Sequence, residues 1–229
     1  MSESLSATTT GTSTEQPLMA EIDPGFAQLL ADYPGQFDVI GDVKSHWLNH
    51  SLHWAVASGV QNTTFGPRNG TVLEFLQKHM QSFESRLKKD GKCFVSGEIG
   101  SSNKRGNKTM RSNCMIVIDD DTGTSRDRSI ELIRERGYAA VVYPTFNDQK
   151  PVTFIKNDDF VRWAQANDRD TIATIETAGL YLAKVKGYQP HVVASIHTVE
   201  MDDDDGPAFR VAHDPFDKTR IILFPTTWN

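Results

Sequence analysis

Apolar residues recur along the chain with two spacings, one typical of helices and one typical of strands. From Val72 to Leu87 they stand three or four positions apart and form a single stripe, which predicts a helix that ends at Gly91. Elsewhere, periodic stretches behind a capping residue predict helices, and short apolar runs bounded by glycine or proline predict strands. The expected helices follow Ser125 and Asn157 and cover residues 171–185, and the expected strands cover residues 92–98, 115–118, 138–143, 190–197, 209–213 and 220–225.

Two of these strands flank a predicted helix and form a strand–helix–strand unit. Met115–Ile118 comes first, Thr124 or Ser125 can cap the helix, and the second strand follows Gly137. Such a unit predicts that the two strands are parallel, or neighbours, in one sheet. Because Met115–Ile118 is apolar throughout, we expect this strand to be buried. The stretch Gly66–Gly70 contains a Gly-Pro and an Asn-Gly pair and predicts a loop.

Three consecutive carboxylates, Asp119, Asp120 and Asp121, follow the strand at residues 115–118. Side chains alternate along a strand, so Asp119 and Asp121 are expected on one face, about 7 Å apart at ~3.3 Å per residue. Both can reach one hard divalent cation, and Mg²⁺ or Mn²⁺ prefers carboxylate and phosphate oxygens. The alternative is a solvated strand end, in which an aspartate or threonine caps the following helix.

A basic loop over residues 100–111, rich in Gly, Ser and Asn, precedes this acidic strand. Its four cations are Lys104, Arg105, Lys108 and Arg111. Arginine and lysine bind phosphate whereas carboxylates bind metal, so the loop and the strand together favour phosphate and metal chemistry. A solvated loop with no ligand is the alternative.

Composition narrows the functional classes. The net charge of −6 over 229 residues argues against nucleic-acid binding through bulk charge alone, although residues 200–205 carry much of that charge in one predicted loop. No apolar run approaches the ~20 residues of a membrane span, and the N-terminus lacks the apolar core of a secretory signal. We therefore expect a cytoplasmic protein without a membrane partner. Residues 1–20, rich in Ser and Thr, predict a disordered tail ahead of one domain over residues 21–229.

Several motifs follow one another in a characteristic order. Lys-Asp-Gly-Lys-Cys-Phe-Val-Ser-Gly ends at Gly97, and the basic loop leads to Ile118–Gly123. A strand then ends in Tyr-Pro-Thr-Phe, and His-Asp-Pro-Phe-Asp-Lys-Thr-Arg-Ile-Ile-Leu-Phe-Pro ends at Pro225. This order resembles the archaeo-eukaryotic primase superfamily, in particular the primase-like domains of phage and plasmid replication proteins. The resemblance covers about residues 88–225.

The resemblance implies an α+β fold, in which helices flank a primase-polymerase-like (RRM-like) mixed sheet, in a domain that is incomplete at its C-terminus. It also implies template-directed nucleotidyl transfer with Mg²⁺ or Mn²⁺ bound by Asp119 and Asp121. The basic loop would then bind template or triphosphate. The implied partners are nucleoside triphosphates, a single-stranded DNA template and a helicase domain or subunit, in the cytoplasm of a bacterial host.

Two further family motifs are harder to place in this sequence. The family binds nucleotide phosphates with a Ser-x-His motif. A literal match is Ser195-Ile196-His197, whereas the loop where related phage domains often carry Ser-His reads Asn147-Asp148. Arg220, which leads the last strand, is another candidate for phosphate binding, and the sequence leaves the choice open. The third acidic motif, a hydrophobic–Asp pair after the last strand, is not identifiable.

Two other functional classes remain open. One is a nucleic-acid-binding replication module that keeps the fold but has no turnover, which the unplaced motifs favour. The other is a phosphohydrolase of the haloacid-dehalogenase type, with Asp119 as the nucleophile and Asp121 as the acid and base. That class carries a DxDxT signature, and Gly123 stands here in place of its threonine.

Overall fold

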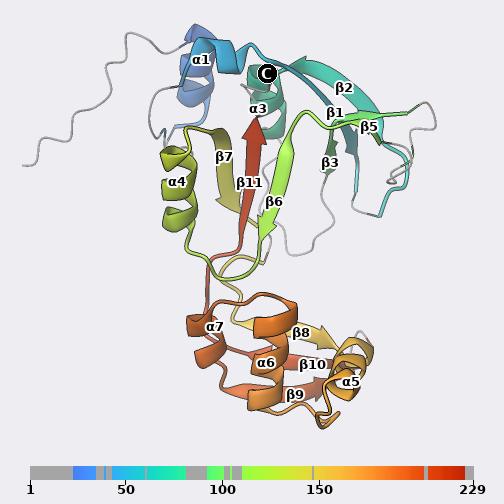
Figure 1. The fold of residues 1–229 in the computed structure, drawn as a ribbon. Helices are drawn as coiled ribbons and strands as arrows, with labels where there is room; N and C mark the ends of the chain where they lie inside the picture. Colours follow the sequence, from blue (N-terminus) through green and yellow to red (C-terminus); the bar gives the residue numbers. More distant parts are fainter. Residues whose placement is uncertain are drawn as a thin grey trace, which may run out of the picture.

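The computed structural model describes residues 23–34, 39, 43–59, 61–80, 92–100, 104, 110–145, 147–203 and 206–224. Within these ranges the chain forms seven helices and four small sheets, all built from antiparallel pairs (Figure 1). The α+β class expected from the sequence is thereby confirmed. The tail expected at residues 1–20 lies outside the described residues, and the assignment of residues 21–229 to one domain stays a prediction.

The sheet that carries the candidate site has three strands in the order β6–β11–β7. β6 (Ile116–Asp120) and β7 (Ala139–Pro144) both run antiparallel to the central β11 (Thr219–Phe224), so they are parallel to each other. Helix α4 (Arg126–Glu135) connects them, and Ser125 caps its first turn by accepting a hydrogen bond from the Arg128 amide. The predicted strand–helix–strand unit is confirmed, with β11 inserted between its two strands.

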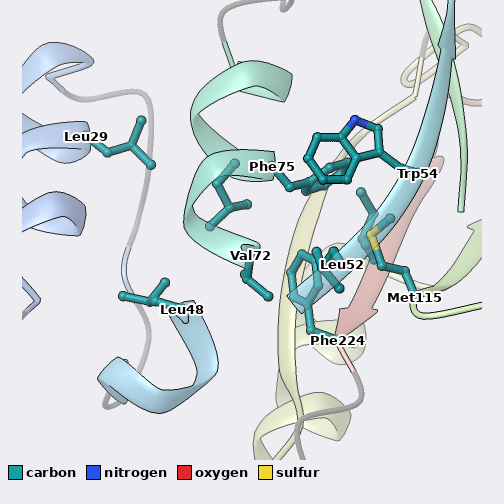
Figure 2. Packing of buried hydrophobic residues seen from close by; sticks show 10 residues of the cluster. Leu29, Leu48, Leu52, Trp54, Val72, Phe75, Met115 and Phe224 are labelled. Carbon is teal, nitrogen blue, oxygen red and sulfur yellow. The ribbon is translucent and has the colours of Figure 1, made fainter. Parts of the chain in front are cut away.

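A second sheet in the order β2–β1–β3 packs against this one. It consists of β2 (Gly66–Thr71), β1 (Ser51–Ala57) and β3 (Cys93–Ser96), and β4 (Glu98–Ile99) pairs with β5 (Met110–Ser112) beside it. The helices on this side are α1 (Pro24–Asp32), α2 (Ser45–Leu48) and α3 (Val72–Met80). Trp54, Phe75 and Phe224 meet in the hydrophobic core that joins them (Figure 2).

The residues between β7 and β11 form a separate unit, which we call the inserted lobe (residues 152–212; Figure 1). Its sheet has the order β8–β10–β9, with helices α5, α6 and α7 beside it. Phe160, Tyr181 and Phe209 lie in a hydrophobic core of its own. The bounds are β8 (Val152–Lys156), α5 (Asn157–Ala166), α6 (Ile175–Val185), α7 (Pro190–Ala194), β9 (Thr198–Asp202) and β10 (Ala208–Ala212).

Several local expectations are wrong, one of them the predicted loop at residues 200–205, whose first three residues belong to strand β9. The run at residues 115–118 was expected to be buried, but only Met115 is, whereas Ile116 and Ile118 are 42% and 41% exposed. The reason is that β6 is an edge strand and α4 packs beside β7, at the far edge of the sheet. Residues 66–70 form an edge strand, where a proline is tolerated, and not a loop. The strand expected at residues 190–197 is instead helix α7 up to Ala194.

None of the helices in the described ranges is both long enough and apolar enough to cross a membrane.

Candidate functional site

One side chain from each of three neighbouring strands forms a polar row at one end of the β6–β11–β7 sheet. The strand register sets Arg220 of β11 between Asp119 of β6 and Tyr143 of β7. Arg220 donates two hydrogen bonds to the carboxylate of Asp119, from Nε to Oδ1 at 2.5 Å and from Nη2 to Oδ2 at 2.8 Å. These bonds raise the pKa of Arg220 above its ordinary value. Two residues that the sequence suggested independently are therefore bonded to each other.

Two aromatic groups at this row, Tyr143 and His79, are uncharged at neutral pH. Burial raises the pKa of Tyr143 to about 12. His79, near the end of α3, lies against Tyr143 with ring centroids 5.6 Å apart and stacks on Phe75 at 5.2 Å. Burial, with the nearby charge of Arg220, lowers the pKa of His79 to about 4. At neutral pH this corner of the sheet therefore combines one charge pair with two neutral aromatic rings.

A second row follows directly beyond the first. The amide of Thr145 donates to the carbonyl oxygen of Lys218 at 2.8 Å, which continues the pairing of β7 with β11 by one step. Because side chains alternate along strands, Thr145 and Lys218 lie on the same face as Tyr143 and Arg220. Asp121, just past the end of β6, is exposed and has no hydrogen bond within the part of the chain described. Burial lowers the pKa of Lys218, and the negative charge of Asp121 opposes that shift.

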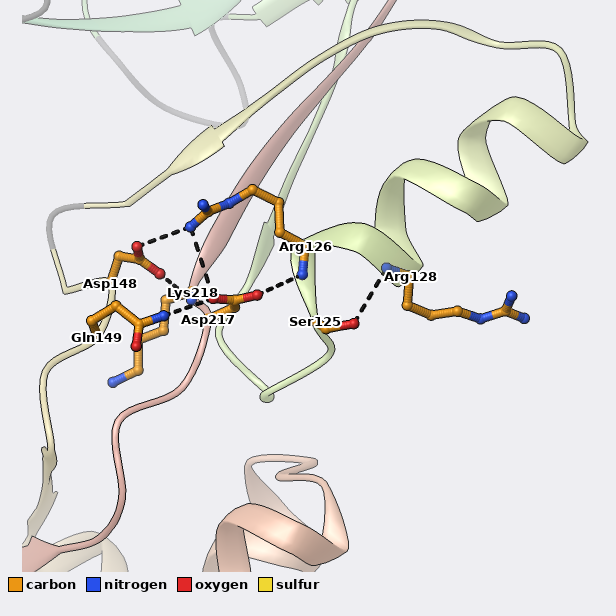
Figure 3. Close-up of polar contacts among 7 residues, drawn as sticks. All are labelled: Ser125, Arg126, Arg128, Asp148, Gln149, Asp217 and Lys218. Atoms are coloured by element: carbon orange, nitrogen blue, oxygen red, sulfur yellow. Dashed lines mark hydrogen bonds and ion pairs between the residues drawn. The ribbon is translucent and has the colours of Figure 1, made fainter. Parts of the chain in front are cut away.

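A network of hydrogen bonds fixes the loops that carry this second row (Figure 3). Asp148 accepts hydrogen bonds from the Arg126 side chain at 2.9 Å and from the Lys218 amide at 2.8 Å. Asp217 accepts from the Arg126 amide at 2.7 Å and from the Gln149 side chain at 2.7 Å. The start of α4 is thereby tied to the loop after β7 and to the segment before β11. These residues hold the loops on either side of the two rows in place.

The inserted lobe meets the sheet at the second row. The Thr153 hydroxyl lies 2.9 Å from the Tyr188 hydroxyl and 3.0 Å from Nε2 of the fully buried His213. Burial raises the pKa of Tyr188, and the charge of Asp121 adds to this rise. The amide of Gln189 donates to the Thr122 carbonyl at 2.8 Å. Asp121 therefore stands where the end of β6 approaches the inserted lobe.

The other predicted site residues are not brought to these rows by any contact in the described ranges. Lys104 is exposed and pairs through its backbone with Thr64. Arg111 is exposed on β5 and lies 3.7 Å from Glu98. Arg105 and Lys108 fall outside the described residues. His197 is exposed in the inserted lobe, where its Nδ1 lies 3.2 Å from the carbonyl oxygen of Ser195.

Among the described residues, the donors available to a cation near the rows are few. No group of three or more His, Cys, Asp or Glu side chains is arranged to hold a metal ion in those ranges. Asp121 offers an exposed carboxylate, whereas both oxygens of Asp119 accept hydrogen bonds from Arg220. Mg²⁺ is commonly bound by one or two carboxylates together with substrate phosphates, so two carboxylates are chemically compatible with such an ion.

Sequence reasoning missed Lys218, Tyr143 and His79. The alternation of Lys218 and Arg220 at the start of an apolar strand was a usable signal, since it places both on one face. The residues next to Tyr143 and His79 in the sequence give no signal of a site. Tertiary packing brings these two side chains to the row.

Comparison of the chain with protein-family models, with curated proteins and with solved structures finds no match to any of them.

Proposed function

We propose that this chain is a metal-dependent nucleotidyltransferase domain of the primase-polymerase kind, acting on nucleoside triphosphates along a single-stranded DNA template. One observation carries the proposal. Two carboxylates, Asp119 and Asp121, alternate along the end of β6, and the basic residues Arg220 and Lys218 stand beside them on β11. Neighbouring anions and cations of this kind suit a ligand that brings both a metal ion and phosphates.

In this proposal the chain's own residues bind and orient the nucleotide. Asp121, with Asp119, would hold Mg²⁺ or Mn²⁺, which when bound lowers the pKa of an attacking 3′-hydroxyl and offsets phosphate charge. Arg220 orients the Asp119 carboxylate through two hydrogen bonds and also interacts with Tyr143, and its guanidinium would contact a phosphate oxygen. The neutral His79 and Tyr143 form an uncharged wall behind this pair.

A specific observation favours a second candidate, a nucleic-acid-binding module without turnover. Both oxygens of Asp119 already accept hydrogen bonds from Arg220, and the described ranges contain no third acidic ligand beside the pair. The same bonds count against Asp119 as the nucleophile of a phosphohydrolase, because a nucleophilic oxygen must be free to attack.

The experiment that tests the proposal measures incorporation of a labelled deoxynucleotide on primed single-stranded DNA with Mn²⁺. The wild-type chain is compared with Asp121→Asn and with Asp127→Asn, a matched change at an exposed aspartate in the first turn of α4. We expect incorporation by the wild type and Asp127→Asn, and a loss of at least 100-fold in Asp121→Asn, in the range reported for removal of a transition-state electrostatic contact. DNA binding without incorporation by the wild type would reject transfer in favour of the binding module.

A further inference from the structure

Lys218 is a buried cation that forms no ion pair with any residue that the structure describes. The residue is only 5% exposed, and its ammonium group lies 4.5 Å from the centre of the Phe216 ring. Within the described residues its side chain forms neither a hydrogen bond nor an ion pair. Figure 3 shows the side chain pointing away from Asp148 and Asp217, the two carboxylates of the neighbouring network.

Such an arrangement is unusual because an ammonium group loses hydration when it is buried. Buried charges in proteins are normally paired or bind a charged ligand. The cation–π contact with Phe216 offsets only part of the lost hydration. The charged groups that act on Lys218 are Asp121 and Asp148, which favour its charged form, and Lys150, which disfavours it. Asp148 already accepts a hydrogen bond from Arg126, so the positive charge of Arg126 offsets part of its negative charge.

A second, independent observation points to the same place. The hydroxyl oxygen of Thr145 is buried and has no hydrogen-bond partner in the described part of the structure. Thr145 is paired with Lys218 through the backbone, and the two side chains leave the sheet on the same face. Neither the Thr145 hydroxyl nor the Lys218 ammonium donates a hydrogen bond within the described residues, and two such donors on one face are complementary to an anionic oxygen acceptor.

We propose that Lys218 and Thr145 bind a phosphate group, and that this group belongs to the polyphosphate tail of a nucleoside triphosphate. The identity of the ligand rests on the proposed function, whereas the phosphate site itself does not. The tail fits this place because Asp119 and Asp121 lie on the same face, where a cation held by them would meet the phosphates. Arg220 and Lys218 then contact different phosphates of one nucleotide, since they are two residues apart on β11.

Calorimetric titration tests this proposal with three probes: dATP, inorganic tripolyphosphate and an oligothymidine that carries only backbone phosphates. The variants are Lys218→Met, Thr145→Val and, as a matched control, Lys184→Met at an exposed lysine of α6. We expect Lys218→Met to weaken dATP and tripolyphosphate binding by about tenfold or more, as for a charge-assisted hydrogen bond. Thr145→Val should weaken both by about threefold or more, and Lys184→Met should leave both unchanged.

The variant Lys218→Met also reports on folding, because removal of an unpaired buried charge should raise the thermal midpoint of the ligand-free protein. A lower midpoint would show that Lys218 has a structural partner and would overturn the proposal. So would equal dATP affinity in the wild type and Lys218→Met, or no binding of either phosphate compound by the wild type. Lys218-dependent binding of oligothymidine alone would overturn the assignment to a nucleotide.

Failure of this proposal and failure of the proposed function are distinguishable. Lys218-dependent binding of dATP by a chain that incorporates no nucleotide would support the phosphate site and reject the transfer activity. Incorporation that is lost in Asp121→Asn but unchanged in Lys218→Met would support the transfer activity and reject the phosphate site.

Discussion

The ion pair between Asp119 and Arg220 should contribute measurably to folding, and a double-mutant cycle can isolate that contribution. The perturbations are Asp119→Asn, Arg220→Met and the two together. The contact is bidentate, but the side chains are 47% and 32% exposed, so solvent screens it in part. Exposed pairs contribute about 0.2–1 kcal/mol, and breaking a buried pair costs about 3–5 kcal/mol. For this half-exposed geometry we expect a coupling free energy of about 1–2 kcal/mol.

Urea denaturation of the four proteins, followed by circular dichroism at pH 7, gives the coupling as the deviation of the double variant from additivity. The coupling should shrink when NaCl is raised from 0.05 M to 1 M, because salt screens partly exposed charges. A coupling free energy below about 0.3 kcal/mol would lie within the error of additivity. It would refute a stabilising ion pair between Asp119 and Arg220. It would then remove the side-chain link between β6 and β11, which pair through their backbones in any case.

Two further predictions concern groups around the rows. Because the pKa of His79 is lowered to about 4 from an ordinary 6.5, the folded state binds fewer protons than the unfolded state between these values. Stability should therefore be full above pH 6.5 and fall as the pH drops towards 4, by up to about 3 kcal/mol at 1.36 kcal/mol per pKa unit. This loss should be absent in His79→Phe when unfolding free energies are measured from pH 7 to pH 4. Asp148→Ala leaves Arg126 and the Lys218 amide without their acceptor, and should lower the urea-derived unfolding free energy by about 2–4 kcal/mol.

Matched substitutions of exposed residues separate these two effects from those of losing any histidine or any aspartate. His197→Phe changes an exposed histidine and should keep the wild-type acid profile. An identical profile for His79→Phe and the wild type would contradict a neutral, partly buried His79. Asp127→Ala removes an exposed carboxylate from the same region as Asp148 and should cost less than about 1 kcal/mol. Equal costs for Asp148→Ala and Asp127→Ala would show that the network in Figure 3 does not hold the loops.

Local signals in the sequence were sufficient for the elements that depend on neighbours along the chain. Helix α4 was predictable because Ser125 caps it and Gly137, with φ +66°, follows it. Local signals failed where tertiary position decides the structure. Residues 66–71 pair with β1 in spite of their turn-like composition. The apolar, β-branched stretch of α7 predicts a strand, although Pro190 at its first turn suits a helix start.

Only part of the candidate site could be predicted from the sequence, again because tertiary position decides the rest. Asp119 and Asp121 stand out because carboxylates directly follow an apolar run, but the partner of Asp119 is 101 positions away. A single sequence does not reveal that β11 crosses back from the inserted lobe to lie between β6 and β7. It also does not reveal burial, which distinguishes Lys218 from the other lysines that the structure describes. His197 matched a motif in sequence and lies in the inserted lobe.

The most direct test of the central claim compares the affinity for a non-hydrolysable deoxynucleoside triphosphate in Mn²⁺ with that in EDTA. If Asp119 and Asp121 hold a cation that meets the nucleotide's phosphates, Mn²⁺ should strengthen binding to the wild type at least tenfold. That gain should disappear in Asp121→Asn and persist in Asp127→Asn. An equal gain in Asp121→Asn, or no gain in the wild type, would contradict the claim.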